Sequence, residues 1–184
     1  MQPFYQGKID NFCAIYAVLN AVQVIHQIRP LRARDIFNDT LLDLSKDIDE
    51  FKAVLEHKTD YCDLVDKMLL SLAKQFPLKV QAPFAADAPC QDVWQTLTEY
   101  ANPDTARTAI FRFVRYEALN YFPLADHWST TLRMDAKGLH LFDCSLEPKG
   151  MYQLRKEDLA QTVAMRKNGY FVIPSESVRL LSLP

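Results

Sequence analysis

One segment constrains the fold more than any other, because residues 12–28, FCAIYAVLNAVQVIHQI, are almost all apolar. Asn11, a favoured N-cap residue, precedes the segment and Pro30 follows it. A helix that is apolar on every side is stable in water only when other elements surround it. The segment therefore predicts a buried central helix, capped by Asn11, around which the rest of the chain packs.

The remainder of the amino-terminal part also favours helices. Residues 61–76 place apolar side chains at helical spacing behind Asp60, which we expect to cap a helix. Residues 33–56 indicate shorter helical pieces, and residues 90–100 indicate a further helix.

The pattern changes after Pro103, where short segments rich in β-branched and aromatic residues begin. They predict strands at residues 108–116, 128–134, 139–144 and 170–173. The tetrapeptide 135–138 predicts a hairpin turn, and residues 155–167 predict one late helix.

These patterns predict a single domain over residues 1–184 of the α+β class. Residues 1–102 form its mainly helical part, with the buried central helix, and residues 103–184 form a mainly antiparallel sheet.

Composition and charge exclude several function classes. Lys and Arg number 21 against 23 Asp and Glu, so no basic field exists to attract nucleic acid or an anionic membrane. Only four glycines are present, and glycine-rich phosphate loops are absent. The four cysteines form no CxxC pair, so we expect neither a metal site nor a disulfide framework.

The amino-terminal sequence has no secretory signal pattern, and no apolar run is long enough to span a membrane. We therefore expect the protein in the cytoplasm, or exported without a classical signal peptide as an effector. The sequence does not indicate its oligomeric state.

Cys13 is the first candidate for chemistry, because it lies one or two positions after the expected helix cap. Unsatisfied backbone N–H groups and the helix dipole favour a thiolate at such a position. The alternative is that Cys13 is a small apolar residue that packs in an apolar helix.

His127 and Asp143 are the partners that such a nucleophile needs. They lie at similar distances from the turn at 135–138, so a hydrogen bond between imidazole and carboxylate is feasible. A cysteine nucleophile requires a base, and the base requires an acceptor that fixes its tautomer. Gln6, one short loop before Cys13, is placed to donate to a developing oxyanion; a solvated glutamine is the alternative.

Taken in chain order, Gln6, Cys13, His127-Trp128 and the LFD of residues 141–143 resemble the papain-like cysteine peptidase superfamily, whose order is Gln, Cys, His, Asn or Asp. The His-Trp pair and the His-to-Asp spacing are similar to those of Josephin-type deubiquitinases, bacteriocin-leader peptidase domains and YopT-type effector proteases. Residues 127–145 also resemble Ulp-type proteases, but there Gln and Cys follow His and Asp.

The resemblance implies a papain-like fold and a cysteine hydrolase that cleaves a peptide, isopeptide or side-chain amide bond through an acyl-thioester. Cys13 would be the nucleophile, His127 the proton shuttle and Asp143 its orienting group, while Gln6 and the Cys13 N–H would stabilise the oxyanion. Trp128 would line the substrate groove or shield the His–Asp bond; a core aromatic is the alternative.

The implied partner is a protein or peptide substrate, and no cofactor is required. Two alternatives stay open. The first is a glutamine deamidase or acyltransferase effector with the same triad, and the second is a non-catalytic binding domain that kept the fold.

We interpret the other histidines and cysteines as structural. These are His26, His57, His140, Cys62, Cys90 and Cys144. The acidic group at Asp43, Asp47, Asp49 and Glu50 is interpreted as a solvated helix face, with a basic partner as the alternative.

Overall fold

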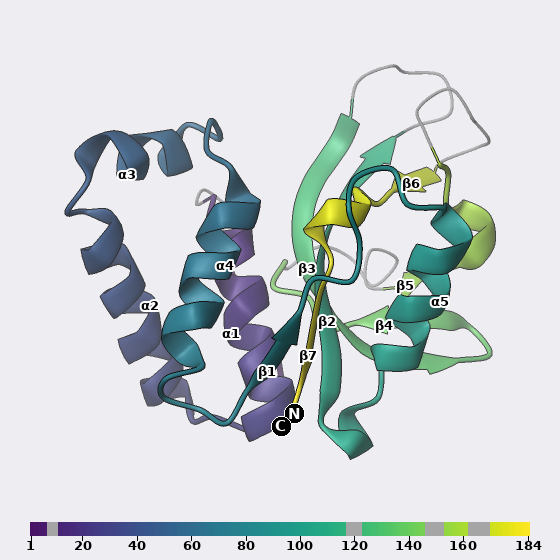
Figure 1. Cartoon of the computed structure of the whole chain (residues 1–184), viewed down its shortest axis with the longest axis horizontal. Coiled ribbons are helices and arrows are strands. Elements are labelled where there is room, and N and C mark those ends of the chain that lie inside the picture. The colour runs from purple at the N-terminus through teal and green to yellow at the C-terminus, as the bar shows by residue number, and fades with distance from the viewer. Residues whose placement is uncertain (7–10, 117–122, 146–152, 162–169) are drawn as a thin grey trace.

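The computed structural model of the chain describes residues 1–6, 11–116, 123–145, 153–161 and 170–184 (Figure 1). Four helices form one side of the molecule, and an antiparallel sheet with one further helix forms the other (Figure 1). The class is therefore α+β, as the sequence predicted. Among the described residues, no helix is both long and apolar enough to cross a membrane.

The helices lie close to their predicted ranges. They are α1 (Cys13–His26), α2 (Pro30–Leu44), α3 (Ile48–Leu55), α4 (Tyr61–Leu72) and α5 (Cys90–Tyr100). The Asp60 carboxylate accepts the Cys62 N–H at 2.9 Å, which confirms the predicted cap of α4.

The predicted cap of α1 is wrong. The N-cap residue is Phe12, which makes no side-chain cap hydrogen bond. The Asn11 amide instead donates to the Leu55 carbonyl at 2.9 Å, at the end of α3. The Asn11 side chain thus forms a tertiary hydrogen bond with Leu55 instead of capping α1.

The sheet has the strand order β1-β7-β2-β3-β4-β5, and β6 also pairs with β2. Its strands are β1 (Lys79–Gln81), β2 (Arg107–Tyr116), β3 (Pro123–Asp135), β4 (Gly138–Leu141), β5 (Gln153–Leu154), β6 (Tyr170–Val172) and β7 (Arg179–Ser182). All of these strand pairs are antiparallel. β1, β5 and β7 were not predicted, because such short strands carry too little periodicity to be recognised.

The sheet is covered on both faces, which explains why the β2 sequence is apolar without alternation. β2 directs Ala109, Phe111 and Phe113 into a core with α5. It directs Ile110 into a second core with α1, α2 and α4. α1 lies between α4 and the sheet, so the buried central helix predicted from its composition is confirmed (Figure 1).

One hydrogen bond ties α1 directly to β3. The Thr130 hydroxyl donates to the Ala17 carbonyl at 2.7 Å, and both residues are buried. This contact fixes the helix that begins with Cys13 relative to the strand that carries His127.

The predicted β3–β4 hairpin is confirmed, with Asp135 paired to Gly138. Gly138 has a φ of 130°, and a Cβ there would collide with the carbonyl oxygen of Leu154 in β5. β4 ends at Leu141, earlier than predicted. Asp143 and Cys144 consequently follow the strand, so their side chains need not point to opposite faces of the sheet.

The late helix predicted over residues 155–167 is wrong for the described residues 155–161; residues 162–167 lie outside the described part. A single 3-10 turn, Lys156–Asp158, stands there. Leu159 then forms a parallel bridge with Phe171, and the Ala160 N–H donates to the Phe171 carbonyl at 2.9 Å. Pairing beside β6 holds this segment extended and overrides its helical periodicity.

Candidate active site

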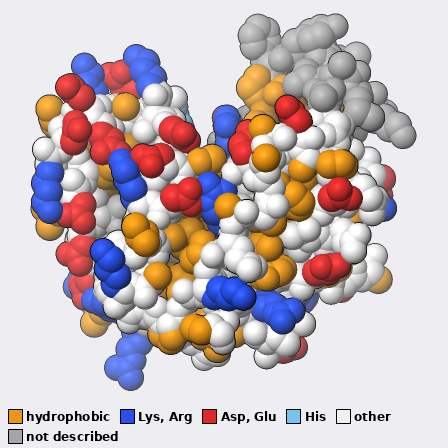
Figure 2. Space-filling view, viewed as in Figure 1, with side chains coloured by type: hydrophobic (Ala, Val, Ile, Leu, Met, Phe, Trp, Pro, Cys, Tyr) orange, Lys and Arg blue, Asp and Glu red, His pale blue; other side chains and the backbone are white. Residues whose placement is uncertain are grey.

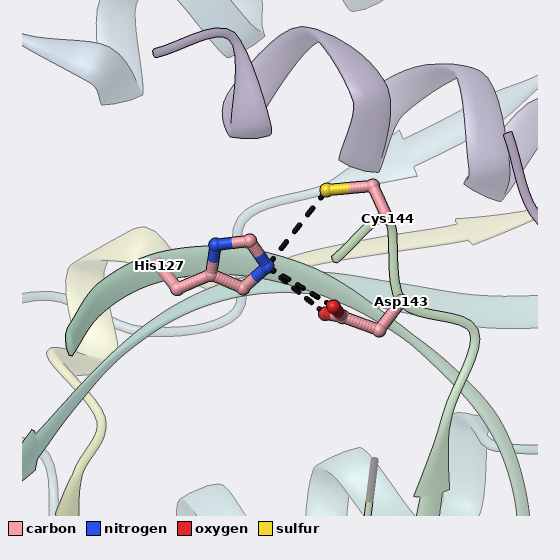
Figure 3. Close-up of side chains that lie close together, drawn as sticks. All are labelled: His127, Asp143 and Cys144. Atoms are coloured by element: carbon pink, nitrogen blue, oxygen red, sulfur yellow. Dashed lines mark hydrogen bonds and ion pairs between the residues drawn. The ribbon is translucent and has the colours of Figure 1, made fainter. Parts of the chain in front are cut away.

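His127 and Asp143 meet beside the β3–β4 hairpin. His127 belongs to β3, and its Nε2 lies 3.2 Å from Asp143 Oδ1 and 3.1 Å from Oδ2 (Figure 3). The side chain of Asp143 is only 2% exposed and that of His127 is 14% exposed. The structure thus brings together the two residues for which the sequence made a hydrogen bond feasible.

Hydroxyl groups fix the Asp143 carboxylate from its other sides. Ser129 donates to Oδ2, and Ser145 donates to Oδ1 through both its hydroxyl, at 2.6 Å, and its N–H, at 2.8 Å. Burial would raise the pKa of Asp143, but the hydrogen bond and charge of His127, followed by these serines, hold the pKa below its usual value. Asp143 is therefore ionised at neutral pH.

The pKa of His127 reflects the same balance. Burial would lower the pKa, but hydrogen bonds with Asp143, Cys13 and Cys144 together outweigh burial, so the pKa is raised. The ionised Asp143 carboxylate thus stabilises the protonated form of the imidazole. The ring also packs edge-on against Phe113, with centroids 5.6 Å apart, and this contact restrains its orientation.

Cys13 begins α1, and its interaction with the His127 ring contributes to the raised pKa of that histidine. Because Nε2 faces Asp143, Nδ1 is the nitrogen left for proton exchange with Cys13. The first-turn N–H groups of α1 have no partners within the helix and are available to an anion.

A pocket of about 320 Å³ gives access to Cys13. The helical part and the sheet part both line it, and the space-filling view shows a notch between these two parts with charged side chains on its walls (Figure 2). Its lining comprises Cys13, His57, Thr59, Asp60, Tyr61, Cys62, Arg112, Asp126 and Trp128. Arg112 donates two hydrogen bonds to Asp126, at 2.7 and 2.5 Å, across the strand pair β2–β3.

Trp128 fits both interpretations of its role. It is 2% exposed and belongs to the core beside α1, yet it also lines the pocket with Cys13. Its indole N–H is buried and has no acceptor among the described residues. A role in substrate binding stays a prediction.

Gln6 lies at the site, but its described contacts are with Cys144. Its N–H donates to the Cys144 carbonyl at 2.7 Å, and its Oε1 accepts from the Cys144 thiol at 3.4 Å. Its role as an oxyanion donor stays a prediction.

Asn20, which the sequence analysis missed, holds the segment that carries Gln6. This buried residue of α1 accepts the Phe4 N–H at 2.7 Å and donates to the Phe4 carbonyl at 3.2 Å. The sequence of α1 offers one signal, because a polar residue in an otherwise apolar buried helix needs a hydrogen-bond partner.

Cys144 is the second residue that the sequence analysis missed. We interpreted it as structural, and it is buried in the core as expected, but its Sγ also lies 3.8 Å from His127 Nε2, a contact that the sequence did not indicate (Figure 3). Burial raises the pKa of this thiol to about 11, although His127 opposes the shift. Cys144 is therefore a neutral thiol at pH 7.

The other histidines lie apart from the His127–Asp143 pair. His140 Nε2 is 2.7 Å from Asp135 Oδ2, and His57 Nδ1 is 3.2 Å from the Tyr61 hydroxyl. The predicted acidic face serves local structure in part, since Asp47 accepts the N–H groups of Asp49 and Glu50 and so caps α3.

Comparison with models of known protein families gives no match, and no curated protein is significantly similar to the chain. The function is therefore inferred from the geometry of the site.

Proposed function

We propose that the protein is a cysteine hydrolase of papain-like arrangement, which cleaves a peptide, isopeptide or side-chain amide bond in a protein or peptide. The observation that carries this proposal is the buried hydrogen-bonded pair of His127 and Asp143, together with Cys13 at the start of α1 as one of the groups that raise the pKa of His127. These three groups are the nucleophile, base and orienting acceptor of a catalytic triad.

In the proposed mechanism, Cys13 transfers its proton to His127 and its sulfur attacks the substrate carbonyl carbon. The resulting oxyanion accepts hydrogen bonds from the first turn of α1 and from the Gln6 amide. His127 then protonates the leaving amine as the carbon–nitrogen bond breaks, which leaves a thioester on Cys13. Water, deprotonated by His127, hydrolyses the thioester and regenerates the thiol. Asp143 keeps the imidazole oriented throughout.

Cys13 is only 6% exposed, but its place in the wall of a pocket supports an enzyme over a non-catalytic binding domain. A thiol sealed from solvent, or a histidine beyond hydrogen-bond reach, would favour the binding domain. Cys13 instead lines the pocket of about 320 Å³ and interacts with His127. The same triad would also serve a deamidase or an acyltransferase, because only the acceptor of the acyl group differs.

Alkylation of the cysteines by iodoacetamide tests the proposal. The rate at each cysteine is measured at pH 6 by peptide mass, with EDTA present, in the wild type and in His127→Ala. Cys62 and Cys90 are internal controls, because burial raises the pKa of each thiol. We expect Cys13 to react at least about tenfold faster than either control, since only a thiolate reacts quickly.

In His127→Ala, we expect the Cys13 rate to fall to that of the controls. If Cys13 reacts no faster than Cys62 and Cys90 in the wild type, or if its rate does not depend on His127, the proposal is wrong. A positive result would be followed by a panel of peptide amides and isopeptides, and the products would separate hydrolysis from deamidation and acyl transfer.

A further inference from the structure

Three potential metal ligands, from His127, Asp143 and Cys144, lie close together, and the Gln6 side chain contacts Cys144. Nε2 lies 3.1 and 3.2 Å from the Asp143 oxygens and 3.8 Å from Cys144 Sγ, which itself lies 3.4 Å from Gln6 Oε1. The Asp143 carboxylate and the Cys144 thiol both point toward Nε2 (Figure 3). One nitrogen, one thiol and one carboxylate thus lie around a small volume, and an amide oxygen lies beside the thiol.

The spacing fits a tetrahedral zinc ion. Zinc binds imidazole nitrogen, carboxylate oxygen and thiolate sulfur at about 2.0 to 2.3 Å, so its ligand atoms lie about 3.3 to 3.8 Å apart in a tetrahedron. The ligand atoms of His127, Asp143 and Cys144 all lie within 4.8 Å of one another. Zinc binding would require these side chains to move until each ligand atom reaches bonding distance.

The donor set and its surroundings favour zinc over the hard cations. A thiol beside an imidazole suits zinc, whereas magnesium and calcium prefer oxygen ligands alone. Ser129 and Ser145 already orient the Asp143 carboxylate, as outer hydrogen bonds do in protein metal sites. The main-chain bond from Gln6 to Cys144 fixes the fourth group beside the thiol.

We propose that His127, Asp143 and Cys144, with Gln6 beside Cys144 as a candidate fourth ligand, form an inhibitory zinc site that the sequence did not lead us to expect. Zinc forms bonds to Nε2, a carboxylate oxygen and Sγ. The Nε2 proton and the Cys144 thiol proton leave to solvent. The inhibition rests on the proposed function, whereas the binding of zinc does not.

Binding would disable the site without occupying Cys13. Zinc on Nε2 replaces the proton that links His127 to Asp143, and its charge lowers the basicity of the ring. Zinc also binds Asp143, which then no longer orients His127. If Gln6 becomes the fourth ligand, its amide is no longer placed to stabilise the oxyanion. Cys13 then has no effective base.

Zinc titration of the full chain against a chromogenic zinc indicator tests the site. We expect the wild type, Cys13→Ser and Cys62→Ser to bind one zinc ion with the same affinity. We expect Cys144→Ser to bind at least about 100-fold more weakly, because loss of a direct ligand should cost no less than loss of an outer-shell partner. Circular dichroism checks that each variant is folded.

A second measurement does not depend on altering Cys144. In the triple variant Cys13→Ser, Cys62→Ser, Cys90→Ser, Cys144 is the remaining cysteine, so a sulfur-to-cobalt charge-transfer band after addition of Co²⁺ identifies it as a ligand. The absence of zinc binding in the folded wild type overturns the proposal. So does a loss of binding in Cys13→Ser but not in Cys144→Ser, which would place zinc between Cys13 and His127.

The inhibitory role is tested by the alkylation rate of Cys13. Zinc should slow this rate in the wild type but not in Cys144→Ser, and an unchanged wild-type rate contradicts inhibition. If zinc binds through Cys144 but Cys13 shows no His127-dependent reactivity in EDTA, the metal site stands and the proposed hydrolase function fails. The two failures are therefore distinguishable.

Discussion

Two histidine–carboxylate pairs lie at the β3–β4 hairpin or directly beside it, and their distances alone do not tell them apart. The outer pair, His140–Asp135, has a nitrogen–oxygen distance of 2.7 Å, shorter than the 3.1 Å of the inner pair, His127–Asp143. The outer carboxylate is 37% exposed at the turn, whereas the inner one is 2% exposed under α1.

The two pairs differ in what surrounds them. In the outer pair, the hydrogen bond to His140, followed by the Lys137 N–H, lowers the pKa of a solvated Asp135. In the inner pair, the histidine has a carboxylate and two thiols around it, and its pKa is raised although burial opposes this. A short contact is therefore a weaker sign of function than a buried pair that also reaches a nucleophile.

The largest expected effect comes from removing the inner histidine. His127→Gln should lower the rate of any Cys13-dependent amide cleavage by about 10³-fold or more, because the base is lost. His140→Gln, the matched change in the outer pair, should alter that rate by less than about twofold. Steady-state kinetics on folded variants makes the comparison, and equal losses in the two variants would rule out a special role for the inner pair.

Replacing each carboxylate with an amide should affect the stability of the protein, and its dependence on pH, more at the inner pair than at the outer pair. At pH 7, Asp143→Asn should lower the free energy of unfolding by about 2 kcal/mol, because a buried charge-assisted network is broken. Asp135→Asn, at the exposed turn, should have a smaller effect.

The sign of the pH dependence follows from the lowered pKa of Asp143. Relative to its usual value of 3.8, a lowered folded-state pKa stabilises the protein above that pH, and this stabilisation is lost as the pH falls through the folded-state value. Urea unfolding at pH 7 and at pH 3 should show the wild type and Asp143→Asn converging at low pH. If the difference in unfolding free energy between the wild type and Asp143→Asn is larger at pH 3 than at pH 7, the pKa of Asp143 is not lowered in the folded state.

The smallest expected effect concerns the contact that couples the inner pair to Cys13. Thr130→Val removes the hydroxyl bond to Ala17 and should cost about 1 kcal/mol of stability. It should also slow Cys13 alkylation several-fold, because α1 is less firmly fixed to β3. Thr98→Val, at a half-buried threonine whose hydroxyl donates to a carbonyl within α5, is the control and should leave that rate unchanged.

Much of the fold was predictable from local pattern. The apolar run 12–28 predicted a buried helix, Asp60 predicted a cap, and the turn 135–138 predicted the hairpin that positions His127 and Asp143. Failures arose where tertiary pairing overrode local preference. Asn11 bonds Leu55 instead of capping α1, and residues 159–160 pair with Phe171 instead of continuing a helix.

For the candidate site, the sequence by itself determined the types and order of the residues, because a nucleophile, a base and an acceptor are recognisable from their chemistry. It could not place Cys144, because that required knowing that β4 ends at Leu141 and that the following residues turn toward His127. It also could not predict how Asn20 holds the segment that carries Gln6.

Only the tertiary structure decided which histidine has both a buried carboxylate and a thiol beside it. Sequence position fixes the neighbours along a strand, but burial and the approach of a helix from another part of the chain depend on packing of the whole core. That packing sets the local dielectric environment and hydrogen-bond partners, and through them the charge states of His127, Asp143 and Cys144.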